Sequence, residues 1–275
     1  MADEMNNYKN KTVLITGASK GVGAETAKQF AKLGANVALV ARNKAPLEAL
    51  ATEINQYGHA AVFPCDIGEI SSLETLVTQV VDTFGAIDVL VNNAGLHHRG
   101  DFEKLTPVQV SNMVNVNLNA PLTLTHLCLE QLKQSNNGAV IMIGSLAGRA
   151  PLQGAAVYSA TKAALRAFSY ALHDELKPHQ VKVAVVSPGP IDTGFIMDEI
   201  DHVEDIVYSQ PMSSALEVAN EIIALSINDS EESAMPWFSG KLTTLAYLFP
   251  KLRRALRPYL YKKGAKAKLK YKNRR

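Results

Sequence analysis

The fold of this chain is constrained most strongly by a regular alternation of short apolar runs with longer helical patterns. The apolar runs are rich in β-branched residues, and the segments between them carry apolar residues every three or four positions. The predicted strands are 12–16, 36–41, 60–65, 87–92, 139–143 and 181–186, and the predicted helices are 21–33, 45–57, 70–84, 107–134 and 155–177. Strands and helices that alternate in this way form right-handed crossovers, so we expect a parallel sheet covered on both faces by helices.

A chain of 275 residues, 47% of them hydrophobic, can bury the extensive core that such a sheet needs. No internal repeat and no Pro/Gly-rich linker precedes about residue 230. We therefore expect one α/β domain over residues 1–240, with a doubly wound, Rossmann-type parallel sheet flanked by helices. Residues 241–275 are expected to form a C-terminal extension.

Charge is divided unequally between these two parts of the chain. Residues 1–232 contain 15 Lys/Arg and all 26 Asp/Glu, whereas residues 233–275 contain 13 Lys/Arg and no acidic residue. The net charge of +2 therefore conceals an acidic body and a strongly basic end. Such an asymmetry concerns binding partners rather than chemistry.

A glycine-rich segment, Thr16-Gly17-Ala18-Ser19-Lys20-Gly21-Val22-Gly23, joins the first predicted strand to the first predicted helix. Backbone N–H groups at the start of a helix, together with the helix dipole, bind a pyrophosphate. Gly21 and Gly23 would let the nucleotide and the sheet approach closely. The spacing G-x-x-x-G-x-G differs from the common dinucleotide pattern G-x-G-x-x-G, and a purely structural turn is the alternative that its position after the first strand argues against.

The end of the second predicted strand indicates which dinucleotide binds. An acidic residue there would take the ribose hydroxyls of NAD(H), but the chain has Ala41 followed by Arg42. Arg42 can hold a 2′-phosphate through two hydrogen bonds, and Lys20 adds a second positive charge. We therefore expect NADP(H) rather than NAD(H), the alternative being that both residues are ordinary surface cations.

Polar or glycine-containing loops also follow the third and fourth predicted strands. Asp66 and Ile67 follow the third, and Asn93, Ala94 and Gly95 follow the fourth. Such residues often serve only to stabilise turns. Because these loops lie at the carboxyl edge of a parallel sheet, where ligands bind, we expect them to border the cofactor.

Ser145 follows the fifth predicted strand, and Tyr158 and Lys162 lie one turn apart near the start of the next long helix. A phenol is a weak base at neutral pH, but a nearby ammonium group and an oxidised nicotinamide ring would lower the pKa of Tyr158. Tyr158 could then exchange a proton with a substrate hydroxyl or carbonyl while Ser145 holds the same oxygen.

The Tyr-x-x-x-Lys spacing is not specific by itself, because it recurs at Tyr247/Lys251 and Tyr259/Lys263. A surface Tyr/Lys pair with a turn serine is therefore the alternative interpretation of Tyr158, Lys162 and Ser145. Their position after the fifth strand, opposite a nucleotide loop, favours the functional one.

In this combination and order, the motifs resemble those of short-chain dehydrogenases/reductases over roughly residues 10–230. The resemblance implies the catalytic residues Asn117, Ser145, Tyr158 and Lys162, with Asn117 rather than Asn115 supporting a water that relays protons to the lysine. It also implies pairing through the long helices 107–134 and 155–177, as a homodimer or homotetramer. The full set of expected cofactor-binding residues is Gly17, Ser19, Lys20, Gly21, Val22, Gly23, Arg42, Asp66, Ile67, Asn93, Ala94, Gly95, Tyr158, Lys162, Pro188, Gly189, Ile191 and Thr193.

The C-terminal part departs from the family pattern. An obvious seventh strand is missing, and 234–240 is expected to be a short version of it. Leucine and phenylalanine recur every three or four residues from Leu242 to Leu260, with Lys and Arg elsewhere on the helical wheel and Pro250 and Pro258 interrupting the pattern. Two interpretations stay open: the extension 241–275 lies on an anionic membrane surface, or its apolar stripe covers the substrate cleft or packs on a partner subunit.

The family covers its substrate with the segment that here lies between Thr193 and Gln210, and its residues from Gly194 to Ile200 mix apolar and acidic side chains. This composition and the amphipathic extension suggest a lipophilic alcohol or ketone, such as a fatty-acyl or steroid-like compound. The residues 97–99, His-His-Arg, could line the entrance, although the favoured interpretation is that they are solvated loop residues.

The sequence thus favours an NADP(H)-dependent carbonyl reductase or alcohol dehydrogenase. The alternative is a catalytically silent nucleotide-sensing or membrane-surface scaffold protein, against which the complete set of four catalytic residues argues. We expect no metal site and no nucleic-acid partner, because no metal-ligand spacing or nucleic-acid motif is evident. Reduced Cys65 and Cys128, a polar N-terminus and the lack of an apolar run of about 18 residues favour a cytoplasmic protein, peripheral at a membrane if the extension binds one.

Overall fold

The computed structural model describes residues 8–273, and its centre is a parallel sheet of seven strands in the order β3-β2-β1-β4-β5-β6-β7. The strands are β1 (Thr12–Thr16), β2 (Asn36–Ala41), β3 (His59–Pro64), β4 (Val89–Asn92), β5 (Ala139–Ile143), β6 (Lys182–Pro188) and β7 (Glu232–Met235). All strands are parallel, but β2 and β3 are added on one side of β1, whereas β4 to β7 are added on its other side, so the order of addition changes direction between β1 and β4. In open α/β sheets, ligands bind at the carboxyl ends of the strands on either side of such a switch point.

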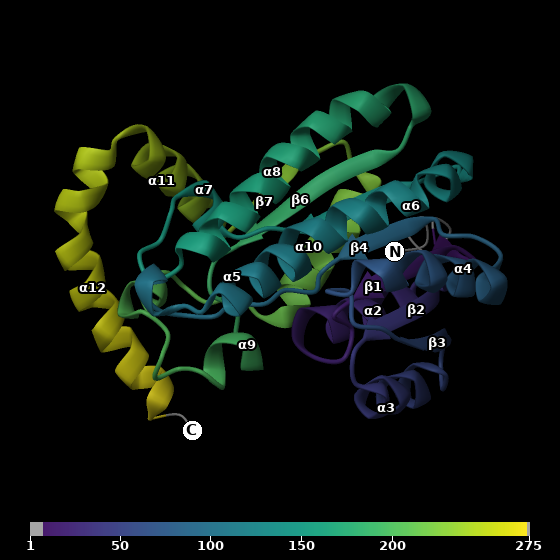
Figure 1. Cartoon of the computed structure of the whole chain (residues 1–275), viewed down its shortest axis with the longest axis horizontal. Helices are drawn as coiled ribbons and strands as arrows, with labels where there is room; N and C mark the ends of the chain where they lie inside the picture. Colours follow the sequence, from purple (N-terminus) through teal and green to yellow (C-terminus); the bar gives the residue numbers. More distant parts are fainter. Residues whose placement is uncertain (1–7, 274–275) are drawn as a thin grey trace.

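Helices cover both faces of the sheet, and Figure 1 shows the layers. The helices are α2 (Gly21–Lys32), α3 (Lys44–Ile54), α4 (Leu73–Phe84), α5 (Pro107–Val114), α6 (Ala120–Gln134), α7 (Leu146–Arg149), α8 (Ala156–Leu176), α9 (Gly194–Met197), α10 (Ala215–Ile227), α11 (Trp237–Leu248) and α12 (Pro250–Lys272). A π-helical turn, Asn115–Asn119, joins α5 to α6, so the predicted helix 107–134 is continuous. One core lies between the sheet and α2, α3 and α10, and the other between the sheet and α4, α6 and α8.

The alternation of side chains along β1 explains why its three central residues are all apolar. Val13 and Ile15 face the core under α2 and α10, whereas Leu14 faces the core under α4, α6 and α8. All three are fully buried. The predicted strands 12–16, 36–41 and 139–143 are confirmed at both ends, because a parallel strand buried on both faces reads as an unbroken apolar run.

The seventh strand differs from the prediction. β7 pairs in parallel with β6 but begins at Glu232 and ends at Met235, and α11 begins at Trp237, so a strand continuing to residue 240 is wrong. Pro236 lacks the N–H group that would extend the ladder.

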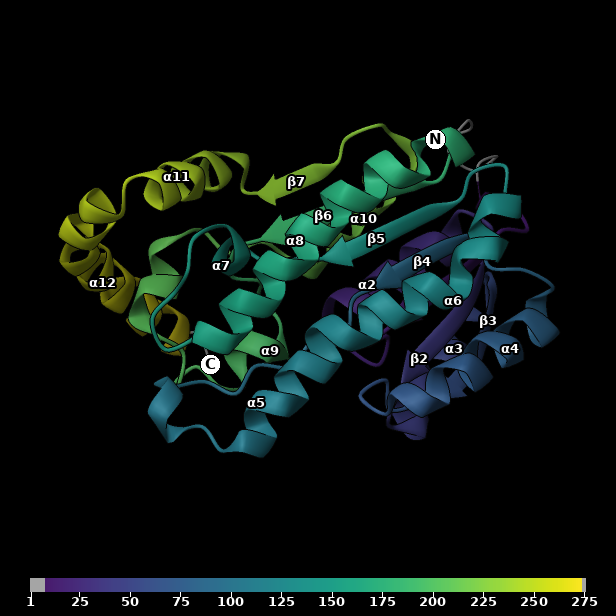
Figure 2. The same cartoon turned by 45° about the horizontal axis from the view of Figure 1, so that its top comes forward.

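The C-terminal extension is helical and curves around the carboxyl edge of the sheet, as Figure 2 shows for α11 and α12. Pro250 occupies the first position of α12, where its missing N–H is harmless. Pro258 lies inside α12, so the expectation that it interrupts the helix is wrong. The second half of α12 packs on the same chain: Tyr261 donates to Glu204 at 3.0 Å, and Lys268 donates to the Val203 carbonyl at 2.7 Å.

Candidate active site

The glycine-rich loop after β1 is shaped by contacts that only glycine permits. Gly17 has φ +67°, and a Cβ atom there would lie 2.8 Å from the Cα of Ala94. A Cβ atom at Gly23 would overlap the carbonyl of Gly17. The loop therefore closes tightly over the start of α2, which begins at Gly21 and presents its N-terminal N–H groups at the carboxyl edge of the sheet.

Asn93 and Ala94 brace this loop from the end of β4. The Asn93 side-chain amide donates to the carbonyls of Thr16 at 2.8 Å and Gly17 at 3.2 Å. The backbone N–H groups of Asn93 and Ala94 both donate to the Thr16 hydroxyl at 3.1 Å. Asn93 and Ala94 therefore contribute to the expected cofactor site by fixing the backbone of the glycine loop.

Lys20 and Arg42 lie at the ends of neighbouring strands. β1 and β2 pair along their whole length, and the Ala18 N–H donates to the Val40 carbonyl at 3.1 Å, which ties the glycine loop to the end of β2. Both Lys20 and Arg42 are exposed. The geometry leaves two cations on one edge, open to an incoming phosphate.

Asp66 and Ile67, both expected to border the cofactor, have different surroundings in the loop after β3. Asp66 is exposed and its carboxylate accepts from the Gly68 N–H at 3.0 Å, a local turn bond. Ile67 is buried in the core under α4 and α6. Only Asp66 of this pair offers a side chain to a ligand at that edge.

Ser145, Tyr158 and Lys162 meet at the carboxyl end of β5. Ser145 caps α7, its hydroxyl accepting from the Ala147 N–H at 3.1 Å, and it lies close enough to Tyr158 to lower the pKa of the phenol. The Lys162 ammonium lies 5.8 Å from the centre of the Tyr158 ring and donates to the Ile143 carbonyl at 2.7 Å. The fold therefore brings Ser145 and Lys162 next to the phenol of Tyr158.

Asn117 lies next to this group in the π-helical turn. Its side chain accepts from the Leu96 N–H and donates to the Leu96 carbonyl, each at 2.7 Å. A Cβ atom on Gly95 would lie 3.7 Å from the Lys162 nitrogen and 3.8 Å from the Asn117 oxygen, so these two polar atoms flank the same small space. Asn117 is fully buried, whereas Asn115 is only half-buried.

The electrostatics of the phenol differ from the expected lowering. Burial raises the pKa of Tyr158 above its ordinary value of 10.0, while the Ser145 hydrogen bond and the Arg99 charge act in the opposite direction. Burial also lowers the pKa of Lys162 to about 8. Without a positive nicotinamide ring beside it, the phenol of Tyr158 therefore stays protonated at neutral pH.

The segment after β6 closes the site from the other side. The Gly189 N–H donates to the Met235 carbonyl at 2.7 Å, and Ile191 forms a parallel bridge with Ser213, so Pro188 to Thr193 leave the sheet in a fixed path. A Cβ atom on Gly21 would lie 3.5 Å from the Thr193 side chain. Thr193 is therefore close to the start of α2, across the expected cofactor cleft.

Three residues at this site were not predicted as contacts of the catalytic group. The His97 ring stacks on the Tyr158 ring, with centres 4.3 Å apart and planes at 15°, and Phe195 lies 6.5 Å from the same ring. Arg99 is 11% exposed and pairs with Glu199 at 2.8 Å. The interpretation of His97 and Arg99 as solvated loop residues is wrong, and the only sequence signal was their place within four residues of Gly95.

A buried ion cluster supports the Ser145 helix and was also not predicted. Glu232 on β7 pairs with Arg149 at the end of α7 and with Arg166 on α8. Arg149 also donates to the Gly240 carbonyl at 3.2 Å and to Thr244 at 2.8 Å, both on α11. The cluster joins the helix behind Ser145 to β7 and to the C-terminal extension.

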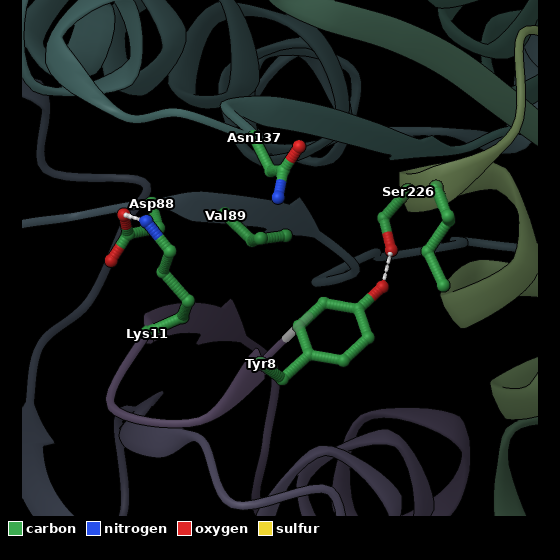
Figure 3. Close-up of a pocket in the computed structure, with 7 residues that line it drawn as sticks. Tyr8, Lys11, Asp88, Val89, Asn137 and Ser226 are labelled. Atoms are coloured by element: carbon green, nitrogen blue, oxygen red, sulfur yellow. Dashed lines mark hydrogen bonds and ion pairs between the residues drawn. The ribbon is translucent and has the colours of Figure 1, made fainter. Parts of the chain in front are cut away.

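The hollow in Figure 3 lies at the opposite edge of the sheet, where Lys11, Asp88 and Asn137 precede β1, β4 and β5. Lys11 donates to Asp88 at 2.9 Å, and the Asp88 carboxylate also accepts from the Thr12 N–H at 2.8 Å. The tyrosine hydroxyl of Tyr8 is hydrogen-bonded to Ser226. These groups satisfy one another and tie the amino ends of the strands together, so this hollow is structural.

The residues at the carboxyl edge fit a dinucleotide. The tight glycine turn at Gly17 and Gly23, the exposed start of α2 and the cations Lys20 and Arg42 together supply N–H donors and positive charge for phosphates. In residues 8–273, no group of three His, Cys, Asp or Glu side chains is placed to hold a metal ion.

Comparison with known proteins gives consistent results. The sequence profile of the short chain dehydrogenase family matches residues 11–204. A ketoacyl reductase of Nostoc sp. is 37% identical over 196 residues, which cover 70% of this chain and 68% of the relative. An 11-beta-hydroxysteroid dehydrogenase-like protein of Arabidopsis thaliana is 35% identical over 212 residues, covering 75% of this chain and 68% of that protein.

Solved structures with the same fold include two complexes with NADP. A metagenomic short-chain oxidoreductase aligns with a TM-score of 0.71 and 29% identity, covering 82% of this chain and 97% of that chain. A short chain dehydrogenase of Burkholderia cenocepacia aligns with a TM-score of 0.73 and 28% identity, covering 82% of this chain and 96% of that chain.

Proposed function

The chain belongs to the short-chain dehydrogenase/reductase family, and on this basis we propose that it is an NADP(H)-dependent oxidoreductase that interconverts a ketone or aldehyde and an alcohol. The observation that carries the proposal is the meeting of Ser145, Tyr158 and Lys162 around one phenol at the carboxyl end of β5. Family membership supports NAD(P) chemistry, and the finer points of cofactor, substrate and residue roles are our inference.

In the proposed reduction, the Tyr158 hydroxyl donates its proton to the substrate carbonyl oxygen. The Ser145 hydroxyl, which lies beside Tyr158, holds the same oxygen in place. When bound, the nicotinamide supplies the hydride for reduction or accepts it in oxidation. The Lys162 ammonium, 5.8 Å from the phenol ring, stabilises the phenolate that proton transfer leaves behind.

Asn117 has a positioning role in this scheme. Its side chain is hydrogen-bonded to both the N–H and the carbonyl of Leu96, and it flanks the same space as the Lys162 nitrogen. A water molecule between them would return a proton to Lys162 from solvent. This role rests on the family resemblance and on the proximity of the two side chains.

The preference for NADP(H) over NAD(H) rests on Arg42 and Lys20. Both are exposed at the edge formed by β1 and β2, and no acidic residue follows β2 directly. Two structural neighbours were solved with NADP, which supports the same preference here. The remaining expected cofactor contacts lie in the glycine loop, at Asp66, in the Asn93–Gly95 loop and between Pro188 and Thr193.

A lipophilic substrate is supported by apolar side chains near Tyr158. Phe195 lies 6.5 Å from its ring, and Leu152 and Val207 line a small cavity together with His97. The relatives include a ketoacyl reductase and a hydroxysteroid dehydrogenase-like protein, whose names denote lipophilic substrates. We infer a fatty-acyl or steroid-like carbonyl compound.

The test is NADPH oxidation by the purified protein with a panel of lipophilic ketones. Tyr158→Phe is expected to reduce kcat by at least about 100-fold, since it removes the general acid. Tyr247→Phe changes the same residue type in a Tyr-x-x-x-Lys spacing far from Ser145, and it is expected to leave turnover intact. Turnover that survives in Tyr158→Phe refutes the mechanism, and NADPH binding without turnover of any ketone favours the nucleotide-sensing alternative.

We also propose a second function, association with an anionic membrane surface through the extension. Its specific observation is a continuous series of exposed large apolar residues on α11 and the first half of α12. Trp237 is 67% exposed and Leu248 is 65% exposed. The other members are Phe238, Leu242, Leu245, Tyr247, Phe249, Leu252, Leu256 and Tyr259.

The charges around this apolar series favour an anionic partner. Within residues 8–273, none of the cations Lys241, Lys251, Arg253, Arg254 and Arg257 forms an ion pair with a carboxylate, and residues 233–275 contain no acid. An interfacial helix gains from buried apolar area and by about 1 kcal/mol for each Lys or Arg near an anionic surface. No helix in the described part of the chain has the length and apolarity to span a bilayer.

Flotation with vesicles tests this second function. The full chain is expected to float with phosphatidylglycerol-containing vesicles and to bind phosphatidylcholine alone more weakly. Leu248→Ser/Phe249→Ser is expected to lose binding, whereas Phe102→Ser, which removes an equally exposed aromatic residue outside the extension, is not. Equal binding by all three proteins, or no binding by the full chain, rules out this membrane surface.

We also propose that the protein is cytoplasmic and forms a homodimer or homotetramer through α5–α6 and α8. Cys65 and Cys128 are free thiols, which supports a reducing compartment. Light scattering after size-exclusion chromatography tests the oligomeric state, and a monomer at micromolar concentration would contradict it.

A further inference from the structure

His97 is held rigidly beside the proposed proton donor. Its ring stacks on Tyr158 at 4.3 Å. The preceding residue, Leu96, is clamped by the Asn117 side chain through two hydrogen bonds of 2.7 Å. Backbone and ring are therefore both fixed, so the free edge of the imidazole has a defined position relative to the phenol.

The contacts of His97 determine which of its nitrogens carries the proton. Arg99 Nη1 lies 3.0 Å from His97 Nδ1, and a guanidinium group can only donate, so Nδ1 accepts. Burial, followed by the charges of Arg99, His98 and Lys162, lowers the pKa of His97 to about 3, so the ring is neutral. The single ring proton therefore lies on Nε2.

The Nε2–H group is a buried donor without an acceptor. Among the described residues no side chain or carbonyl accepts from it, and the atom is shielded from solvent. The adjacent cavity is lined by His97, Arg99, Leu152, Gly154, His202 and Glu204. A buried donor left without a partner costs about 1–3 kcal/mol, and a ligand that supplies the acceptor recovers this energy.

The charge of the surroundings defines which acceptor fits. The Arg99 guanidinium is already engaged by Glu199 at 2.8 Å and by the Phe195 carbonyl at 2.9 Å, so it offers no free cation for an anionic group. A neutral imidazole N–H and a paired arginine suit an uncharged oxygen better than a carboxylate.

We infer that His97 is a specificity-determining residue that binds a second, uncharged acceptor oxygen of the substrate, close to the carbonyl that Tyr158 protonates. This inference rests on the proposed oxidoreductase function. It predicts preference for a compound with two neighbouring oxygens, such as a 3-oxo ester, over a ketone of equal chain length that lacks the second oxygen.

The test compares methyl 3-oxodecanoate with 2-nonanone in wild type, His97→Phe and His97→Gln. Phe keeps an aromatic ring against Tyr158 but removes the donor, whereas Gln restores an N–H donor. The ratio of kcat/KM for the ester to that for the ketone is expected to fall about tenfold in His97→Phe, mainly through KM, and to recover partly in His97→Gln. The exposed residue His179, changed in His179→Phe, is the matched control and should leave the ratio unchanged.

A binding measurement separates this inference from the proposed function. Calorimetric titration of the two compounds into the Tyr158→Phe protein with NADPH reports affinity without turnover, and His97→Phe in that background is expected to weaken only the ester. If wild type turns over neither these two compounds nor any other ketone of the panel, the proposed function fails, and calorimetry still decides the role of His97. Equal losses for both compounds, or no loss for the ester, overturns the inference.

Discussion

Single residues at the β1–β2 edge would decide which cofactor binds. Arg42 and Lys20 lie at the ends of adjacent strands and are exposed, so a 2′-phosphate could reach both without rearrangement of the sheet. The adenosine ribose of NAD(H) lacks this phosphate, so it would offer no negative charge to Arg42 and Lys20. The proposed discrimination would therefore depend on charge rather than on shape.

Arg42→Asp is expected to reverse this discrimination. The carboxylate repels the 2′-phosphate and accepts from ribose hydroxyls, so the ratio of kcat/KM for NADPH to that for NADH should fall by about 100-fold or more, equivalent to about 3 kcal/mol. Lys32→Asp makes the same charge change at the far end of α2 and should leave the ratio unaltered. Steady-state kinetics with both cofactors measure the ratio, and a wild-type preference for NADH would contradict the assignment.

Lys162 is expected to give the proposed reaction a pH dependence with a defined sign. Burial lowers its pKa from 10.5 to about 8, so the ammonium is present below about pH 8 and is lost above it. Because the ammonium stabilises the phenolate, kcat/KM for ketone reduction is expected to decline above about pH 8. Lys162→Met should be at least about 100-fold slower and should lack this limb. A profile that is flat to pH 10 in wild type would show that Lys162 does not act through its charge.

At this scale the sequence predicted residue types and order, but not contacts. Tyr158, Lys162 and Ser145 were found from their place after a strand, because the carboxyl edge of a parallel sheet collects such residues. The contact of His97 with Tyr158 and the tautomer imposed by Arg99 depend on the path of the loop after Gly95, which has no periodic signal.

Among the elements, β7 shows how a strand can be held by charge. Its side chains are only half-buried and its sequence, Glu-Ser-Ala-Met, has no apolar run. Glu232 at its start accepts hydrogen bonds from Ser187 at 2.7 Å, Tyr170 at 2.6 Å and Arg166 at 2.9 Å. For this reason periodicity placed the strand too late, whereas the apolar strands β1, β2 and β5 were predicted at both ends.

Glu232→Gln is expected to destabilise the protein by about 1–3 kcal/mol at pH 7, because it leaves the largely buried Arg149 and the half-buried Arg166 without a carboxylate. Burial alone would raise the pKa of Glu232, but its hydrogen bonds with Arg166, Arg149, Tyr170 and Ser187 lower it to about 2. A lowered pKa means that its stabilisation is present above about pH 4.5 and is lost between about pH 4.5 and 2.

Urea denaturation of wild type and Glu232→Gln from pH 7 to pH 3 measures this dependence. The difference in unfolding free energy should be constant down to about pH 5 and shrink below it. Asp229→Asn removes an exposed carboxylate near the same strand and serves as the control. A difference that does not change with pH would show that the cluster acts by packing instead of charge.

Across the whole molecule, the separation of charge along the sequence becomes a contact in space. The basic end of α12 packs on the acidic segment between Thr193 and Gln210: Lys268 pairs with Asp205 at 3.1 Å, and Lys272 pairs with Asp201. Glu204, which accepts from Tyr261, also lines the cavity beside His97. The extension therefore has an exposed apolar first part and a second part that packs against one wall of the proposed substrate site, a division that charge counting alone could not reveal.

The packing of α12 on the body is most sensitive to substitution at Gly264. It is buried, and a Cβ atom there would overlap the Asp205 carbonyl, so Gly264→Leu should push α12 away from the body. We expect easier proteolysis within α12, a loss of about 1–3 kcal/mol in stability and a several-fold higher KM for the ketone, because Glu204 loses its support. The affinity for NADPH should not change, since the glycine loop lies elsewhere.

Lys266→Leu places the same side chain on an exposed position of the same helix and should preserve both proteolytic resistance and KM. Limited trypsin digestion followed by mass spectrometry locates the cleavage sites, and kinetics on the intact protein give KM. An unchanged KM in a Gly264→Leu protein whose α12 is cleaved freely would show that the substrate wall stands without the extension. A raised KM with intact NADPH binding would instead link the packing of α12 on the body to the geometry around Tyr158.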